Sequence, residues 1–161
     1  MTDEIQELFQ HIGQLAFASV PTDKWDTIKL TIRAIQPYVE EDVAYQHAEE
    51  QFVPKLFLIE DDDLGDYEQV TPSFERLRQL MYNEAPFRGA WYTAVMTITH
   101  DGKFTTDFEY DKKPVFRYES SDEEYVRDFR HFPRNEASTP EWLKEIVRKH
   151  GLVYHEPAPL A

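Results

Sequence analysis

The stretch THDGKFTTDFEYD, residues 99–111, decides how this chain folds, because it has the form of a turn followed by the second strand of a β-hairpin. A three-residue loop, 100–102, keeps apolar side chains on one face, whereas a two-residue turn would mix polar and apolar side chains on both faces. The longer loop also places Gly102 where a type I turn with a G1 bulge requires positive φ. The pairs then expected on the buried face are Ile98/Phe104, Met96/Thr106, Ala94/Phe108 and Tyr92/Tyr110.

Three carboxylates, Asp107, Glu109 and Asp111, occupy alternate positions of the second strand. In the predicted register they all lie on the solvent face. Side chains at i and i+2 on one face of a strand are about 6–7 Å apart, which is too far to chelate one ion without other ligands. We interpret them as a hydrated sheet face or a partner-binding face rather than a catalytic pair.

The composition is that of one compact domain, 1–161, with a hydrophobic core. Of the 161 residues, 41% are hydrophobic and 14% aromatic, and there is no cysteine, so disulfides, thiolate metal sites and cysteine nucleophiles are excluded.

The first residues lack the basic and apolar regions of a secretory signal. No apolar run approaches the roughly 20 residues that span a bilayer. We expect a cytoplasmic protein without a membrane partner.

The charge balance is strongly acidic. Lysine and arginine number 17 against 31 aspartates and glutamates, which gives a net charge of −14. A negative field of this size disfavours direct binding to a nucleic-acid backbone and attracts a basic protein. Acidity for solubility alone is the alternative.

The first half of the chain predicts one helix and three strands. Residues 3–18 carry apolar side chains at helical spacing, with Thr2 as N-cap. Residues 26–35 alternate between apolar and polar side chains, as a half-buried strand does. Segments 42–48 and 51–59 are the candidates for a second and a third strand, the latter at an edge because of Pro54.

An acidic segment, 60–68, is expected to form a loop before a helix over residues 72–84. Thr71 is the predicted N-cap and Pro72 the first helical residue. The loop does not fit a calcium-binding EF-hand in either frame, because the required positions hold Leu64 or Gly65 in place of acidic ligands. A solvated loop or a docking site for a cationic partner is the better interpretation.

After the hairpin, the sequence favours a short strand over 115–118, a helical turn with Tyr125 and Phe129, and a helix over 140–150. Thr139 is the predicted N-cap of that last helix, and Gly151 ends it. The tail, 156–161, is expected to be flexible.

No pattern typical of catalysis or of cofactor binding occurs. The histidines show neither HxH nor HExxH spacing, and no GxSxG, GxGxxG or phosphate-binding loop is present. We therefore predict no catalytic residues, no metal and no cofactor.

Several motifs together resemble the YezG/EsaG-type immunity proteins, the antitoxins of bacterial polymorphic toxin systems. The resemblance covers about residues 3–111. It is carried by Trp25 before the first strand, by Trp91 and Thr93 in the second β region, and by the DGKF and DFEYD motifs at 101–104 and 107–111. Segment 112–161 matches nothing in this pattern. The resemblance implies a protein without enzymatic activity that binds a cognate toxin, often a nuclease, and blocks it.

The predicted fold class is α+β, with an antiparallel β-meander sheet and helices packed on one face. The expected function is neutralisation of a basic nuclease toxin through an acidic surface. The predicted toxin-binding residues are Asp61, Asp62, Asp63, Asp66, Glu68, Asp107, Glu109 and Asp111. An acidic adaptor domain and a metal-assisted hydrolase that uses the carboxylates of 60–68 are the alternatives.

Overall fold

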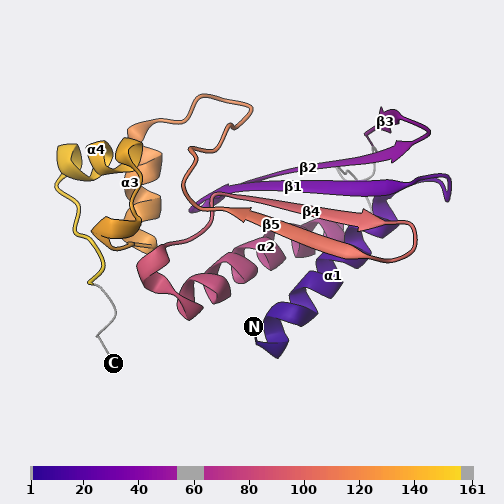
Figure 1. Ribbon diagram of the computed structural model, residues 1–161, viewed down its shortest axis with the longest axis horizontal. Coiled ribbons are helices and arrows are strands. Elements are labelled where there is room, and N and C mark those ends of the chain that lie inside the picture. The colour runs from indigo at the N-terminus through magenta and orange to yellow at the C-terminus, as the bar shows by residue number, and fades with distance from the viewer. Residues whose placement is uncertain (1, 54–63, 157–161) are drawn as a thin grey trace. The chain divides into compact units, whose positions relative to one another are not determined.

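The computed structural model describes residues 2–53 and 64–156, and it gives the side chains of 2–53 and 72–156 (Figure 1). The helices are α1 (Asp3–Ser19), α2 (Leu64–Glu84), α3 (Asp122–His131) and α4 (Glu141–His150), with short 3-10 turns η2 (Pro86–Arg88) and η3 (Glu136–Ser138). The strands are β1 (Thr27–Ile35), β2 (Tyr38–His47), β3 (Glu50–Phe52), β4 (Thr93–Thr99) and β5 (Phe104–Glu109). None of the described helices is long and apolar enough to cross a membrane.

The five strands form one antiparallel sheet in the order β3-β2-β1-β4-β5. Strands β1, β2 and β3 follow one another as neighbours, and α2 then separates them in sequence from the β4–β5 hairpin, which joins the sheet beside β1. This arrangement confirms the predicted α+β class. It also makes β5 an edge strand, with β4 on one side of it only.

The hairpin turn has the predicted form. The Thr99 N–H donates to the Lys103 carbonyl at 2.9 Å, and the Gly102 N–H donates to the Thr99 carbonyl at 2.9 Å. Gly102 has φ of 88°, as the G1 bulge requires. At the far end of the hairpin the prediction is wrong by one residue, because the Tyr92 N–H donates to the carbonyl of Glu109 rather than pairing with Tyr110. An extra residue on one strand of a ladder has this effect.

Contacts divide the described chain into two compact units, which we describe separately. Unit 1 contains residues 1–32, 41–77 and 94–107, and unit 2 contains residues 33–40, 78–93 and 108–161.

In unit 1, α1 packs its apolar stripe against the sheet. Thr2 caps the helix by accepting the Ile5 N–H at 3.3 Å, as predicted. Ile5 and Ile12 are almost fully buried on the inner face. On the outer side, an ion pair of 2.9 Å joins Arg76 of α2 to Glu4.

Three boundaries in this half of the chain differ from the prediction. Strand β2 begins at Tyr38, four residues before the expected start at residue 42, since only two residues separate it from the end of β1. Only Glu50–Phe52 of the expected third strand, 51–59, is a strand, and residues 54–59 lie outside the described part. Helix α2 begins at Leu64, so Pro72 lies inside the helix and Thr71 is not its N-cap.

In unit 2, α3 and α4 pack against each other over an aromatic core. The core residues are Ile35, Tyr92, Phe116, Tyr125, Val126, Phe129, Leu143, Ile146 and Val147. The structure has no strand at 115–118, which is an irregular segment. Pro140, not Thr139, is the N-cap of α4, because the Thr139 hydroxyl donates to the Asn135 carbonyl instead. Gly151 ends α4 in the left-handed region, as predicted.

A buried ion pair between Arg78 of α2 and Asp128 of α3 holds unit 2 together. Both side chains are 3% exposed, and Arg78 Nη2 lies 3.0 Å from Asp128 Oδ2. Arg78 Nε also donates to the Trp91 carbonyl at 2.7 Å, and the Gln36 N–H donates to Asp128 Oδ1 at 2.6 Å. Each charge therefore has several hydrogen-bond partners, which a buried ion pair needs in order to offset its desolvation cost.

Replacing Asp128 by alanine should lower the free energy of unfolding by about 3–5 kcal/mol, since it leaves the Arg78 guanidinium buried without a counter-charge. The double variant Arg78→Met/Asp128→Leu removes both charges and should lose less than Asp128→Ala alone. Urea denaturation of the three proteins measures this difference. Equal losses in the single and double variants would contradict the assigned role of the unpaired charge.

Candidate functional site

The eight carboxylates predicted to bind a toxin lie in different parts of the chain. Asp61, Asp62 and Asp63 lie outside the described residues. Asp66 and Glu68 belong to the first turns of α2, so this end of the predicted acidic loop is helical. Asp107 is exposed on β5 in unit 1. Glu109 and Asp111 lie in unit 2, at and just after the end of β5.

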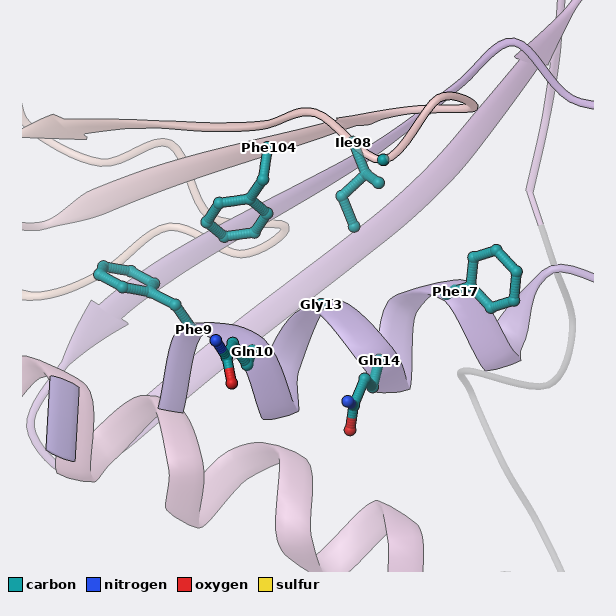
Figure 2. Close-up of a pocket in the computed structure, with 8 residues that line it drawn as sticks. Phe9, Gln10, Gly13, Gln14, Phe17, Ile98 and Phe104 are labelled. Carbon is teal, nitrogen blue, oxygen red and sulfur yellow. The ribbon is translucent and has the colours of Figure 1, made fainter. Parts of the chain in front are cut away.

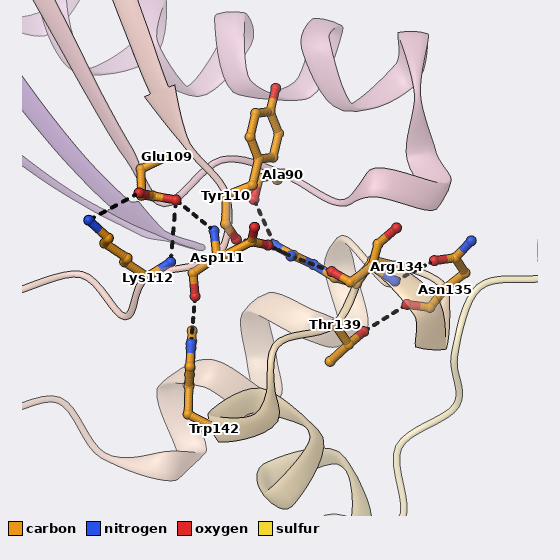
Figure 3. A network of polar contacts seen from close by, with 10 residues as sticks. Ala90, Glu109, Tyr110, Asp111, Lys112, Arg134, Asn135, Thr139 and Trp142 are labelled. Carbon is orange, nitrogen blue, oxygen red and sulfur yellow. Dashed lines mark hydrogen bonds and ion pairs between the residues drawn. The ribbon is translucent and has the colours of Figure 1, made fainter.

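The carboxylate of Glu109 accepts hydrogen bonds from the backbone of the residues that follow it (Figure 3). Its Oε2 accepts the Asp111 N–H at 3.1 Å and the Lys112 N–H at 3.5 Å. The Lys112 ammonium lies 3.9 Å from Oε1. The Asp111 amide is the main reason why the pKa of Glu109 is lowered, and the Lys112 amide adds to it. This carboxylate therefore stabilises the turn that follows β5.

The carboxylate of Asp111 lies beside a buried cation. The guanidinium of Arg134 is 2% exposed, and its Nη1 lies 3.5 Å from Asp111 Oδ1, while Asp111 itself is 72% exposed. Arg134 also donates to the carbonyls of Tyr110 and Ser138, each at 2.9 Å (Figure 3). Trp142 Nε1 donates to the Asp111 carbonyl at 2.6 Å. The backbone at Asp111 is thus fixed, and its exposed carboxylate has a defined position.

Unit 2 also carries an aromatic cluster that was not predicted from the sequence, made of the exposed Tyr38 and Tyr118 and the buried Phe116. The rings of Tyr38 and Tyr118 meet edge to face at 5.1 Å, and Phe116 stacks on Tyr118 at 5.6 Å. Both tyrosine rings are 38% exposed. Exposed tyrosines of this kind are common at protein interfaces.

Two carboxylates lie behind this cluster. Glu40, which is 2% exposed, accepts the Tyr38 hydroxyl at 3.1 Å and the Arg117 N–H at 3.1 Å. Glu124 accepts the Tyr118 hydroxyl at 2.6 Å. Burial, together with these hydrogen bonds to carboxylates, raises the pKa of both tyrosines, so they stay neutral donors at ordinary pH. The sequence signal was a tyrosine two residues before Glu40 in β2, but the partner residues come from a distant irregular segment.

An apolar groove lies in unit 1 between α1 and the β4–β5 hairpin (Figure 2). Its volume is about 530 Å³. Phe9, Gly13 and Phe17 line it from the helix, and Ile98 and Phe104 line it from the hairpin. Phe17 is 58% exposed and Phe104 is 38% exposed, so the groove presents a substantial apolar surface to solvent.

Gly13 shapes the floor of this groove. A Cβ atom at this position would lie 3.6 Å from Phe104 Cε2 and 3.9 Å from Ile98 Cδ1, which are ordinary van der Waals distances. A side chain at this position would therefore meet no steric clash, and the backbone of Gly13 does not have the positive φ that favours glycine. The sequence feature that could have drawn attention to this site is a glycine inside a helical apolar stripe, between Phe9 and Phe17.

The described residues provide no constellation for metal chemistry. Among residues 2–53 and 72–156, no group of three or more histidine, aspartate or glutamate side chains converges as metal ligands do. The hydrolase alternative depended on the carboxylates of 60–68, of which 60–63 lie outside the described part.

We compared the sequence with models of known protein families, and one family matches. The family described as "Immunity protein YezG-like" matches residues 5–143, which is most of its length. The chain belongs to the YezG-like immunity protein family. A search of curated proteins finds no match to it.

Membership of the YezG-like family confirms the resemblance drawn from the DGKF and DFEYD motifs. The match extends beyond the region that carried the resemblance, through α3 and into α4. It gives the chain an immunity role, which implies binding of a cognate toxin, and immunity proteins are generally not enzymes.

Replacing Gly13 by alanine should raise the free energy of unfolding by about 0.5–1 kcal/mol, because it removes the conformational entropy cost of a helical glycine without a steric conflict. Gly102→Ala is the matched control. A Cβ there meets nothing within 4 Å, but φ is +88°, so it should destabilise by about 1–2 kcal/mol. Thermal and urea denaturation measure both, and a loss of stability in Gly13→Ala would contradict the described packing.

The pKa of Glu109, measured by ¹³C NMR titration of its carboxyl carbon, should lie below the ordinary value of 4.5. A carboxyl whose pKa is lowered by folding adds stability above its unfolded pKa, and this contribution is lost as the pH falls through the folded pKa. Lys112→Ala keeps both backbone donors, so the pKa should stay low in that variant. A return to 4.5 in Lys112→Ala would show that the ammonium is the main cause.

Proposed function

We propose that this chain neutralises a cognate bacterial nuclease toxin by presenting an acidic surface to its basic nucleic-acid-binding cleft. Family membership supports an immunity role, and the net charge of −14 supports a cationic partner. Nucleases that bind nucleic acid present cationic clefts, because phosphate neutralisation dominates their affinity. A folded acidic protein competes for such a cleft.

The proposed toxin-binding residues remain the eight predicted carboxylates. Asp107 and Asp111 are the most accessible of those whose side chains are described, and Asp111 is held at a fixed backbone position by Arg134 and Trp142. Glu109 acts through the turn it stabilises. Negative charge of this kind accelerates diffusional encounter more than it strengthens the final complex.

We further propose that the protein acts in the cytoplasm, where an incoming nuclease reaches its nucleic acid. It needs no cofactor for this role, since occlusion of a cleft is a binding event. The cognate toxin is expected to be the product of a reading frame directly upstream.

The decisive experiment is expression of that upstream toxin domain with and without this chain. Growth should be lost with the toxin alone and restored by co-expression, and the purified chain should abolish DNA or RNA cleavage by the purified toxin in vitro. An adaptor would show neither effect. Rescue without inhibition of cleavage would contradict a nuclease target, and cleavage of any substrate by this chain alone would contradict its role as an inhibitor.

Charge reversal tests the acidic surface. The variant Asp107→Lys/Asp111→Lys should lower the association rate constant for the toxin about tenfold at low salt and much less at high salt, because screening removes steering. Glu75→Lys/Glu145→Lys, a double reversal at exposed positions of α2 and α4, is the matched control with the same change in net charge and should change the rate much less. Stopped-flow or surface plasmon resonance at two ionic strengths gives the rates. Equal effects of the two variants would assign the steering to overall charge rather than to this surface.

A further inference from the structure

The groove of unit 1 lies beside an open strand edge. β5 ends the sheet, so the outward backbone groups of Phe104 and Thr106 have no strand partner among the described residues. Because Lys103 is hydrogen-bonded to Thr99 across the hairpin, residues 103, 105 and 107 direct their N–H and C=O groups toward β4. Phe104 and Thr106 therefore direct theirs outward. The exposed edge and the groove share Phe104.

The two faces of β5 differ in chemistry. Phe104 lies on the groove side, where its ring meets Phe9 of α1 edge to face at 5.9 Å. The side chains of Thr105 and Asp107 point to the opposite face, since side chains alternate along a strand, and both are exposed. In a strand added beside β5, every second side chain would therefore lie over the groove. The side chains between them would lie on the opposite face, near the carboxylate of Asp107.

The outer lip of the groove is neutral although the chain is strongly acidic. Gln10 and Gln14 of α1 form this lip, and both side chains are exposed (Figure 2). Amide side chains satisfy the backbone of a neighbouring segment without the desolvation cost of a charge. The apolar groove therefore has a polar lip on the helix and a hydrogen-bonding edge on the strand.

We propose that the free edge of β5 and the adjoining groove together bind an extended segment of the cognate toxin in which apolar and basic side chains alternate. The segment adds a sixth strand to the sheet beside Phe104 and Thr106. Its apolar side chains enter the groove at Gly13, and its basic side chains pair with Asp107 on the other face. This inference rests on the proposed function and names the surface and the toxin segment that meet.

Two variants, each with a matched control, test the contact surface. Gly13→Leu fills the groove from the helix, where the Cβ itself makes ordinary contacts. Thr106→Pro removes an outward N–H while leaving the ladder with β4 intact. Each variant should bind the upstream toxin domain more weakly, with a dissociation constant raised by about tenfold or more. The matched controls, Gly13→Ala and Thr106→Ala, retain the groove and the N–H, and their dissociation constants should remain within about twofold of the wild type.

Amide hydrogen exchange of the wild-type chain gives a second measurement that needs no variant. In the free chain, the Thr105 amide should be protected and the Phe104 and Thr106 amides should exchange quickly. In the complex with the toxin domain, the amides of Phe104 and Thr106 should become protected. This alternation distinguishes strand addition from a general loss of solvent access.

The outcomes separate the two proposals. The groove proposal is overturned, and the proposed function stands, if Gly13→Leu and Thr106→Pro bind the toxin domain as well as the wild-type chain does and the wild-type complex shows no new protection at Phe104 and Thr106. If the wild-type chain does not bind the upstream toxin domain, both are overturned. Loss of binding in the two variants with intact binding in their controls supports the added strand.

Discussion

The buried ion pair between Arg78 and Asp128 is the constraint on which unit 2 depends. It joins α2 to α3 and also ties the backbone at Gln36 and Trp91, so four segments far apart in sequence meet at one pair of charges. The rings of Trp91, Tyr92 and Phe132 lie around the guanidinium, with centroids 4.8–6.0 Å from its central carbon. A charge placed in this way tolerates few alternative packings, because each alternative leaves a buried ion without its partner.

The same chain uses its carboxylates for two different purposes. Asp128, Glu40 and Glu109 accept backbone or side-chain hydrogen bonds and hold loops in place. Asp107 and Asp111 remain largely exposed. The net charge therefore overstates the charge that a partner meets at close range, although all ionised groups contribute to its long-range attraction.

Local patterns in the sequence predicted the elements that local physics controls. The apolar spacing of 3–18, the three-residue turn and Gly102, and the glycine that ends α4 are confirmed, because each depends on neighbours within a few residues. The sequence predicted a helix start at Pro72, but α2 begins at Leu64 and continues through this proline. The resemblance carried by Trp25, Trp91, Thr93 and the DGKF and DFEYD motifs is confirmed by the family match.

The candidate surfaces were harder to predict, because they depend on distant segments. The aromatic cluster combines Tyr38 of β2 with an irregular segment near residue 117, for which the sequence favoured a strand. The groove combines α1 with a hairpin some ninety residues later, so no local sequence pattern predicted it. The predicted carboxylates 61–63 lie outside the described residues and stay a prediction.

The open edge of β5 has a further consequence for the behaviour of the chain among its own copies. An unpaired strand is a template on which a second identical molecule is able to assemble, and many proteins guard such edges with charged side chains. Here Lys103 and Asp107 lie at this edge, and each copy carries fourteen surplus negative charges. Electrostatic repulsion between two copies therefore opposes the pairing of one β5 edge with another, whereas a basic segment such as the one proposed above would not meet this repulsion.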